Sequence, residues 1–499
     1  MAKVDAKGRA EADFYFKLRA EESGKKARGP SKETIRRDRE ELFDASHGSS
    51  GIRFDEYEAV PVQRSGPGAE PRGPKALASF DDLADAKFAV PKFVLENVRR
   101  CGYKRPTPIQ AHCLPLALDD KNDLMSCAQT GSGKTCAFLV PAISRLDPNA
   151  REGSSDKKGS LAASPSVVVM APTRELAIQI HHEARRLAFD DEANAAVAPP
   201  RAVVVYGGAD AKAQLRELAR GCDVLVATPG RLTDFVDRGV VSLSNTKRLI
   251  LDEADRMLDM GFEPQIKKIL KLCPSARQTL MFTATWPEAV RKIAEQFTVD
   301  PTHVRIGDGG TRLTANTSIT QTVEIIDEDS KLDRAIAVLK KNITDGARGI
   351  VFCGTKRRCD FLDRKIKACG LRSAGAVHGD KDQAEREYSL DLFRKGKAPL
   401  LVATDVAARG LDIKGVTHVV NFDMARDVES YVHRIGRTGR AGEVGESVTF
   451  WNPDYDIACS PALCKIARDA GQEVPEWLAK YEKGKESKQW KVADAVLKS

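Results

Sequence analysis

The chain has 499 residues, enough for two or three domains, and 42% of them are hydrophobic, so it can bury substantial cores. The 79 basic and 71 acidic residues leave a net charge of +8, which permits nucleic-acid binding without requiring it. Eleven cysteines without a C-x-x-C pair argue against a zinc site and for reduced thiols, and we expect neither a membrane span nor a signal or transit peptide.

Composition divides the chain into segments with different expected structures. Residues 1–75 are charged and rich in Gly, Pro and Ser, and we expect them to be mostly disordered apart from one amphipathic helix around Ser31 to Phe43. Residues 467–499 read as a basic tail that is helical or frayed.

The segments between these termini alternate short apolar strands with helical stretches. Residues 76–308 contain SVVVMA, RAVVVY, CDVLVAT, RLILDE and QTLMFTA, and residues 321–466 repeat the rhythm with ARGIVFC, APLLVATD and THVVNF. A polar, Gly-containing linker at 309–320 separates them. The sequence therefore predicts an α/β protein of two doubly wound parallel-sheet domains, joined by a flexible linker and with disordered termini.

The sequence AQTGSGKT has the composition of a loop that cradles phosphates. Its glycines let backbone N–H groups curl around a phosphate, Lys134 can reach the β/γ-phosphates, and the Thr135 hydroxyl can ligate Mg²⁺. The usual first glycine is Ala128 here, and a lone glycine-rich turn is a weak signal. The candidate residues are Ala128, Gln129, Thr130, Gly131, Ser132, Gly133, Lys134 and Thr135.

The stretch LILDEADRMLDMGF begins with three branched apolar residues, 249–251, which predict a buried strand. Two carboxylates, Asp252 and Glu253, follow directly at the end of that strand. Ligands of open α/β sheets bind at the carboxyl ends of strands, so these acids occupy a nucleotide-binding position. Asp252 would hold Mg²⁺ through ATP and water, and Glu253 would orient the attacking water. The alternative is a strand followed by a solvated acidic turn. The phosphate loop upstream favours the catalytic interpretation.

The second domain carries HRIGRTGR, with arginines at intervals of three and no phosphate loop of its own. Such an array suits a solvated helix face equally well. Beside a nucleotide site on another domain, Arg434 and Arg437 are interpreted as arginine fingers, since a planar guanidinium matches the γ-phosphate oxygens.

With these motifs in order, residues 80–480 resemble a DEAD-box ATP-dependent RNA helicase of superfamily 2. The resemblance implies RecA-like domains and a catalytic set of Lys134, Asp252, Glu253, Arg434 and Arg437. It implies further contacts to ATP from Phe80 (with Phe88 as a competitor for the adenine), Arg105, Thr107, Gln110 and, at the ribose, Asp412.

The same resemblance implies a set of RNA contacts, made to phosphates and 2′-hydroxyls with little reading of bases. In the first domain they are Pro172, Thr173, Arg174, Gly207, Gly208, Thr228, Pro229, Gly230 and Arg231. In the second domain they are Gly354, Thr355, Gln383, Arg386 and Thr404.

Two positions depart from the family pattern. The usual Ser-Ala-Thr is Thr283-Ala284-Thr285, which keeps a hydroxyl, and a common proline is Ala425. Residues 47–66 resemble the N-terminal extension of Vasa-like and translation-initiation helicases, whereas MFTATWPEAVRKIAEQF resembles the nuclear branch of splicing and ribosome assembly, so the pathway stays open.

The sequence thus predicts an RNA-stimulated ATPase that uses ATP and Mg²⁺, binds single-stranded RNA across both domains and opens short duplexes or remodels RNA–protein complexes. We expect a monomeric core, protein partners at the termini, no membrane partner, and a cytoplasmic location with the nucleus or nucleolus as the alternative. An ATP-gated RNA clamp and a P-loop ATPase of DNA metabolism remain as other interpretations.

Overall fold

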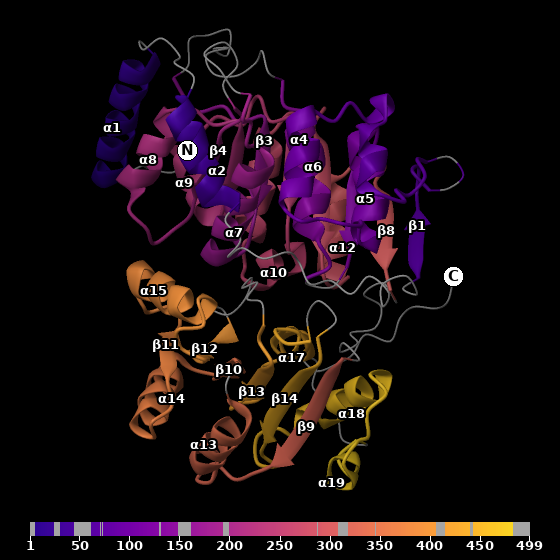
Figure 1. Cartoon of the computed structure of the whole chain (residues 1–499), viewed down its shortest axis with the longest axis vertical. Helices are drawn as coiled ribbons and strands as arrows, with labels where there is room; N and C mark the ends of the chain where they lie inside the picture. The colour runs from indigo at the N-terminus through magenta and orange to yellow at the C-terminus, as the bar shows by residue number, and fades with distance from the viewer. Residues whose placement is uncertain are drawn as a thin grey trace. The chain divides into compact units, whose positions relative to one another are not determined.

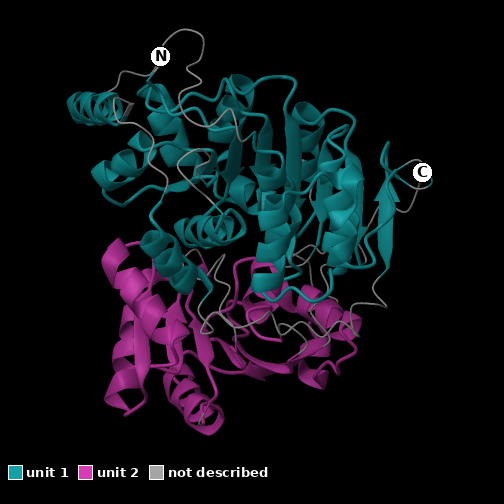
Figure 2. Cartoon of the chain, turned by 45° about the horizontal axis from the view of Figure 1, so that its top comes forward, with its two compact units in different colours: residues 1–50, 54–310 teal, residues 51–53, 311–499 magenta. Residues whose placement is uncertain are grey.

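The computed structural model describes residues 5–23, 30–43, 61–69, 71, 73–128, 131–147, 161–192, 199–286, 288–307, 318–344, 346–405, 415–439 and 443–482. The chain divides into two compact units (Figure 2). Unit 1 comprises Met1–Ser50 and Phe54–Gly310, and unit 2 comprises Gly51–Arg53 and Thr311–Ser499.

Unit 1 is built, in its described residues, around an eight-stranded sheet in the order β1-β8-β2-β7-β6-β3-β5-β4. Neighbouring strands are parallel, except that β1 runs antiparallel to β8. The strands are β1 Val62–Ser65, β2 Leu124–Cys127, β3 Val167–Met170, β4 Ala202–Val205, β5 Val224–Ala227, β6 Arg248–Leu251, β7 Gln278–Thr283 and β8 Thr302–Ile306.

Helices cover both faces of this sheet (Figure 1). On β3, Val167 and Val169 belong to one hydrophobic cluster and Val168 and Met170 to the other, because successive side chains of a strand point to opposite faces. The long helices are α1 Ala6–Ser23, α2 Lys32–Phe43, α4 Lys92–Arg100, α5 Pro108–Leu118, α6 Lys134–Ser144, α7 Arg174–Leu187, α8 Ala211–Ala219, α9 Pro229–Asp237, α10 Ala254–Asp259, α11 Glu263–Leu272 and α12 Glu288–Phe297, and the short 3₁₀ helices are η2 Phe80–Ala84 and η3 Ala86–Phe88.

Unit 2 repeats the architecture with a six-stranded sheet that is parallel throughout its described strands, in the order β11-β12-β10-β13-β14-β9. Its strands are β9 Ile319–Ile325, β10 Gly349–Phe352, β11 Ser373–Val377, β12 Leu400–Ala403, β13 His418–Asn421 and β14 Gly445–Trp451. Its helices are α13 Lys331–Asn342, α14 Lys356–Ala368, α15 Gln383–Arg394, α17 Val428–Ile435, η4 Ile457–Cys459, α18 Ser460–Asp469 and α19 Glu476–Ala479.

The predicted fold class is confirmed, since both units are doubly wound α/β sheets whose central strands are buried on both faces. The predicted linker lies mostly outside the described residues, and β9 begins at Ile319, two residues before the predicted start of the second domain at residue 321. Among the described helices, none is both long enough and apolar enough to cross a membrane.

The prediction of a mostly disordered N-terminal segment is wrong for α1 and β1. On α1, Tyr15 is fully buried and Ala12 nearly so, both in the cluster that fills one face of the sheet. Burial of one such ring stabilises a fold by about 2 kcal/mol. Packing of this kind orders a helix even where the charged composition of the segment predicts disorder. The helix expected around Ser31 to Phe43 is confirmed as α2.

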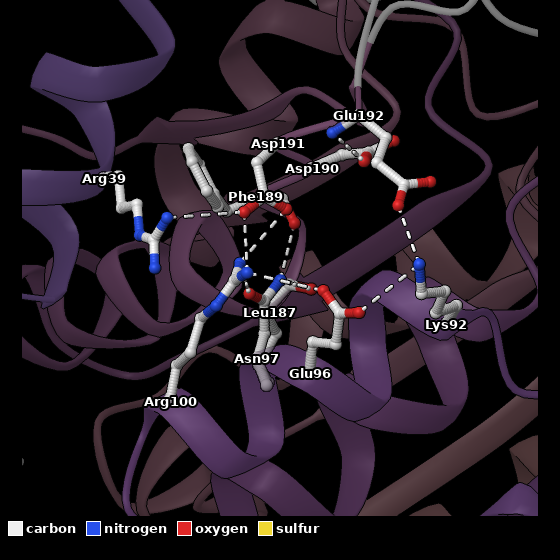
Figure 3. A network of polar contacts seen from close by, with 10 residues as sticks. All are labelled: Arg39, Lys92, Glu96, Asn97, Arg100, Leu187, Phe189, Asp190, Asp191 and Glu192. Atoms are coloured by element: carbon white, nitrogen blue, oxygen red, sulfur yellow. Dashed lines mark hydrogen bonds and ion pairs between the residues drawn. The ribbon is translucent and has the colours of Figure 1, made fainter.

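The helix α2 lies against α7 and a surface network of ion pairs near it (Figure 3). Arg100 of α4 binds Asp191 at 2.6 Å, and Arg39 of α2 lies 3.8 Å from the same carboxylate. Beneath the ion pairs, the buried Asn97 donates to the carbonyls of Leu187 and Phe189 at 3.2 and 2.6 Å. The network therefore joins the N-terminal segment, α4 and the end of α7.

The boundary expected at residue 466 between the second domain and a tail is also wrong. The helix α18 continues to Asp469, and Leu478 of α19 is 1% exposed. Trp477 and Tyr481 each lie 5.1 Å from the ring of Trp451 on β14. These aromatic contacts attach the segment to unit 2 as far as Tyr481, a tertiary effect that the basic composition of the tail concealed.

Candidate functional site

The sheet order of unit 1 brings the predicted nucleotide motifs together. The phosphate loop follows β2, Thr283-Ala284-Thr285 ends β7, and Asp252 follows β6, and these three strands are neighbours. Because their carboxyl ends meet at one edge of the sheet, the three motifs lie side by side.

The phosphate loop has the backbone that its sequence predicts. Gly131 and Gly133 have φ of +80° and +93°, a region that favours glycine. A Cβ at Gly131 would meet nothing within 4 Å, so the loop has room beside it. Lys134 opens α6, is 7% exposed and donates to the carbonyl of Ala128 at 2.8 Å. Gln129 and Thr130 lie outside the described residues.

Thr107 and Gln110, predicted to read the adenine base, contact the phosphate loop. The Thr107 hydroxyl donates to the Ser132 carbonyl at 2.7 Å, and the Gln110 amide donates to the Gly133 carbonyl at 3.2 Å. Gln110 also accepts from the backbone N–H of Thr107 at 2.9 Å, which closes a capping box at the start of α5. Adenine recognition stays a prediction. What the structure describes is a support that sets the position of the loop.

The two candidate stacking rings, Phe80 and Phe88, are both 7% exposed and belong to one hydrophobic cluster. The ring of Phe80 lies 6.0 Å from that of Tyr103, and Lys87 lies over the ring of Phe88 at 4.8 Å. Arg105 is exposed. Which ring stacks on adenine, and whether Arg105 contacts ATP, stay predictions.

The two acids after β6 are buried, one with a raised pKa and the other with a strained backbone. Burial, reinforced by the neighbouring charge of Glu253, raises the pKa of Asp252 to about 7 against the opposing pull of Lys134. Glu253 is 5% exposed and has φ of +51°, a left-handed conformation that costs a non-glycine residue about 1 kcal/mol. Its Oε2 atom is buried with no hydrogen-bond partner in the structure, and the nearest arginine, Arg256, is 3.9 Å away. Strain and unmet charge in one place are typical of functional sites.

Asp255 is a residue to which the sequence analysis gave no role of its own. One of its oxygens accepts from the backbone N–H of Ala284 at 3.1 Å, and from the N–H and hydroxyl of Thr285 at 2.8 Å each. The Thr283 hydroxyl donates to the Thr285 carbonyl at 2.7 Å. The acidic motif after β6 is thus bonded to the hydroxyl motif after β7. The available signal was the shared strand-end position of the two motifs.

The predicted RNA contacts of unit 1 gather at the other half of the same sheet edge. They follow β3, β4 and β5, which are neighbours. The Arg174 guanidinium lies directly against Gly208, which has φ of +78°, and Arg231 donates to the Ala209 carbonyl at 3.2 Å. Thr173 caps α7 through its hydroxyl, so part of its role is structural. Of the rest, Pro172, Thr228 and Pro229 are buried and Gly230 is exposed.

The predicted RNA contacts of unit 2 lie at the carboxyl ends of its strands or on the helices that follow. Gly354 and Thr355 follow β10 after the buried Cys353 and are exposed, and Thr355 caps α14. Gln383 begins α15 and binds Glu387 at 2.8 Å, while Arg386 on the same helix is 6% exposed. Thr404 follows β12 and is 8% exposed. Their RNA contacts stay predictions, and Asp412 lies outside the described residues.

The prediction that Arg434 faces a γ-phosphate is wrong. Its guanidinium is 2% exposed and binds both oxygens of Asp405, at 2.5 and 2.8 Å. It also donates to the Asp423 carbonyl at 2.6 Å and lies over the ring of Phe352. Local spacing could not show that a carboxylate 29 residues away takes this side chain. Arg437 is 4% exposed and donates to the His433 carbonyl at 3.0 Å; its role as an arginine finger stays a prediction.

The donor set of unit 1 fits Mg²⁺ bound together with a nucleotide. No group of three or more ligating side chains occurs in the described residues, so a cage made of protein side chains is not found there. Thr135 is half-buried at the start of α6, and the burial of Asp252 places a carboxylate where a cation stabilises its charged form. One hydroxyl and one carboxylate suit Mg²⁺, which keeps several waters and takes further oxygens from phosphates.

Two family models match the chain, one in each unit. Residues 107–293 match the DEAD/DEAH box helicase model, and residues 330–442 match the helicase conserved C-terminal domain. Together they span more than half of the chain, with the phosphate loop, the paired acids and the arginine motif in the expected order. The chain belongs to the DEAD-box helicase family.

Similar proteins agree with this assignment. The chain is 48% identical over 392 residues to DEAD-box ATP-dependent RNA helicase 40 of Oryza sativa subsp. japonica, a match over 78% of this chain and 46% of the relative. It therefore spans less than half the length of that protein.

Two solved structures of S. cerevisiae Dbp5 share the fold. The complex with RNA and ADP BeF3 has a TM-score of 0.66 and 27% identity, over 82% of this chain and 100% of the other. A Dbp5 variant bound to Gle1 and IP6 has a TM-score of 0.60 and 28% identity, over 79% and 93% of the two chains.

Proposed function

We propose that the protein is an ATP-dependent RNA helicase: an RNA-stimulated ATPase that binds single-stranded RNA and opens short duplexes or remodels RNA–protein complexes. One observation carries this proposal. A single sheet edge in unit 1 holds a nucleotide half, after β2, β7 and β6, and an RNA half, after β3, β5 and β4. The adjacent strands β6 and β3 join the two halves, so both ligands contact one rigid element.

The nucleotide half has the groups that hydrolysis requires. The loop amides and Lys134 bind the phosphates of ATP, and Thr135 and Asp252 hold Mg²⁺ together with ATP and water. Mg²⁺ supplies charge neutralisation at the phosphate oxygens. Glu253 orients a water whose oxygen bonds to the γ-phosphorus while the bond to the bridging β,γ-oxygen breaks, and ADP and phosphate leave.

The RNA half suits a ligand recognised by its backbone. Arg174 and Arg231 supply positive charge beside exposed or half-buried glycine backbone, which matches phosphates and 2′-hydroxyls. Aromatic residues are 6% of the chain, so a ladder of stacked bases is not the main source of affinity. The Dbp5 complex with RNA and ADP BeF3 supports the same pair of ligands for this family member.

The compartment is proposed from the thiols. All eleven cysteines are free, and ten of them are buried. Burial raises the pKa of Cys113 and of Cys127 to about 12, which keeps both as inert thiols. We propose a reducing compartment for the protein, the cytoplasm or alternatively the nucleus or nucleolus.

The test compares polymers and nucleotides on the full chain. ATP turnover is measured with single-stranded RNA and with DNA of the same sequence, and opening of a short RNA duplex is followed with ATP and with a non-hydrolysable analogue. RNA should stimulate turnover well above DNA, and ATP should support repeated duplex opening. Equal stimulation by both polymers would contradict the RNA assignment. Tight RNA retention with the analogue and no opening with ATP would identify a clamp instead.

A further inference from the structure

The helix α1 packs along α8 (Figure 1) and forms an ion pair at the C-terminal end of α9, and the predicted RNA motifs precede these two helices. The helix α8 follows the Gly207–Gly208 turn, and α9 begins directly after Thr228. Neither family model includes α1, since the first match begins at residue 107. A helix from the N-terminal segment therefore contacts the helices that follow the predicted RNA contacts.

The contacts of α1 with α8 involve an aromatic ring and a helix end. Phe14 lies beneath the cations of Lys212 and Arg216, at 5.8 and 5.5 Å from its ring centre. Arg19 donates to the carbonyl of Ala219, the last residue of α8, at 2.9 Å. Carbonyls at a helix C-terminus have no partner within the helix and carry partial negative charge, so an arginine there fixes the end of α8.

The contacts of α1 with the rest of unit 1 are mostly buried. Glu11 is 8% exposed and forms an ion pair with Arg238, the residue that caps α9. Arg238 also binds Asp234 of α9 at 2.7 Å. Tyr15 is fully buried, and its hydroxyl donates to the Leu161 carbonyl at 3.0 Å. The helix α1 is thus bonded to both α8 and α9.

The ends of α8 and α9 nearest the RNA half are bonded to each other. Arg231, in the first turn of α9, donates to the carbonyl of Ala209, just before α8, and its guanidinium lies 5.2 Å from the ring of Phe235. Burial lowers the pKa of Arg231; the charge of Asp234 and, more weakly, that of Glu11 oppose this shift, and the charge of Arg238 adds to it. Glu11 and its ion-pair partner Arg238 therefore both lie within electrostatic reach of the guanidinium that is expected to contact RNA.

We propose that α1 is a positioning element for the RNA contacts of unit 1, in which Glu11 and Phe14 set α9 against α8 so that Arg231 is held ready for an RNA phosphate. This inference rests on the proposed function, because it needs single-stranded RNA as the ligand. The helix α2 provides a contrast: the contacts that fix it are with α7 and with the ion pairs of Figure 3.

The test measures direct binding of a fluorescein-labelled single-stranded RNA by anisotropy, on the full chain. Glu11→Gln should weaken RNA binding about threefold to tenfold, the usual size of an effect transmitted through packed elements. The matched control is Glu21→Gln, the same chemical change at an exposed position of the same helix, which should leave the affinity unchanged. Phe14→Leu keeps an apolar contact and loses the attraction to the two cations, and should weaken binding about twofold.

A double-mutant cycle separates positioning from general stability. In an Arg231→Ala background, Glu11→Gln should have little further effect on RNA affinity, because the group that it positions is gone. In the otherwise unchanged chain, Glu11→Gln should raise the RNA concentration that half-saturates ATP turnover, with little change in kcat and in the KM for ATP.

Two results would overturn the inference. One is an RNA affinity of Glu11→Gln equal to that of Glu21→Gln, with only the melting temperature lowered. The other is full additivity of Glu11→Gln and Arg231→Ala. Failure of the proposed function looks different: RNA would then fail to stimulate ATP turnover in the unmodified chain, while anisotropy would still report on the role of α1.

Discussion

The two sheets of this protein have the same architecture and treat the acids at their strand ends in opposite ways. In unit 1, Asp252 and Glu253 are buried beside each other, one with a pKa raised to about 7 and the other in a left-handed conformation. In unit 2, Asp405 binds Arg434 through both oxygens, and Asp423 binds Arg358 at 2.9 Å and the N–H of Gly354 at 2.8 Å.

This difference indicates that the acids of unit 1 take part in the reaction, whereas those of unit 2 stabilise the structure. Buried charge that is only weakly compensated raises the energy of the folded state and is relieved by a ligand of opposite charge. Charge that is already paired holds loops in position and has little left to give to a ligand. We therefore expect substitutions of the paired acids of unit 1 to change chemistry, and substitutions that break the Asp405 and Asp423 pairs of unit 2 to change stability.

The largest expected effect is that of Glu253→Gln in unit 1. Hydrolysis should slow about a thousandfold, because the carboxylate that orients water is lost. ATP affinity should remain, and the melting temperature of unit 1 should fall little, since the Oε2 atom has no hydrogen-bond partner and its ion pair with Arg256 is long, at 3.9 Å. Single-turnover hydrolysis and calorimetry on one preparation measure both quantities. Hydrolysis at the rate of the unmodified chain would mean that another group orients the water.

In unit 2, Arg434→Ala should cost about 3 kcal/mol of stability, because it leaves Asp405 without its buried partner. The measurement is urea unfolding of the full chain, with the transition of unit 2 followed through its tryptophans. The comparison variant is Arg437→Ala on the next turn, which should lower ATP turnover with a smaller loss of stability. If Arg434→Ala left stability unchanged and removed turnover, the contrast between the two edges would fail.

A smaller effect is expected from Lys134→Ala, which should weaken ATP binding about a hundredfold, or 2.7 kcal/mol. The variant loses the ammonium that reaches the phosphates and that also opposes the raised pKa of Asp252. Titration calorimetry with ATP and Mg²⁺ measures the affinity. Lys121→Ala, an exposed lysine before β2, is the control and should bind ATP as the unmodified chain does.

The smallest effect concerns acid stability at the far edge of unit 1. Burial lowers the pKa of His181 from 6.5 to about 4, although its bond to the Ala202 carbonyl on β4 opposes the shift. A depressed pKa gives stability that is present above pH 6.5 and lost as the pH falls towards 4. The loss should be on the order of 2 kcal/mol, since the ring is only partly buried.

The check is the melting temperature of unit 1 as a function of pH. His181→Gln, which can still donate to Ala202, should melt with a shallower dependence between pH 6.5 and about 4. Identical slopes for the two proteins would assign the acid sensitivity to other groups.

The fold class and the nucleotide half were predictable because both depend on local patterns. A run of branched residues ending in Asp252 and Glu253 specifies a strand and its carboxyl end, and two glycines before Lys134 specify the phosphate loop. Burial of these strands on both faces then follows from their continuous apolar composition.

What the sequence concealed depends on contacts between distant segments. The partner of Arg434 is Asp405. The partner of the Tyr15 hydroxyl is the carbonyl of Leu161, more than a hundred positions away. Averaging composition over residues 1–75 hid the cluster of Phe14, Tyr15 and Phe16 within charged neighbours. The role of Asp255 was hidden for the same reason, because the hydroxyl and the two N–H groups that it binds follow a different strand.

The antiparallel strand β1 has a practical consequence for anyone who wishes to prepare unit 1 alone. It pairs with β8 from Val62↔Ile306 to Ser65↔His303 and so covers an edge that would otherwise expose unpaired N–H and C=O groups. An expression fragment cut at the start of the matched family region, residue 107, removes that cover together with α1, α2 and α4. A fragment that begins before α1 retains the covered edge and is the better choice for crystallisation.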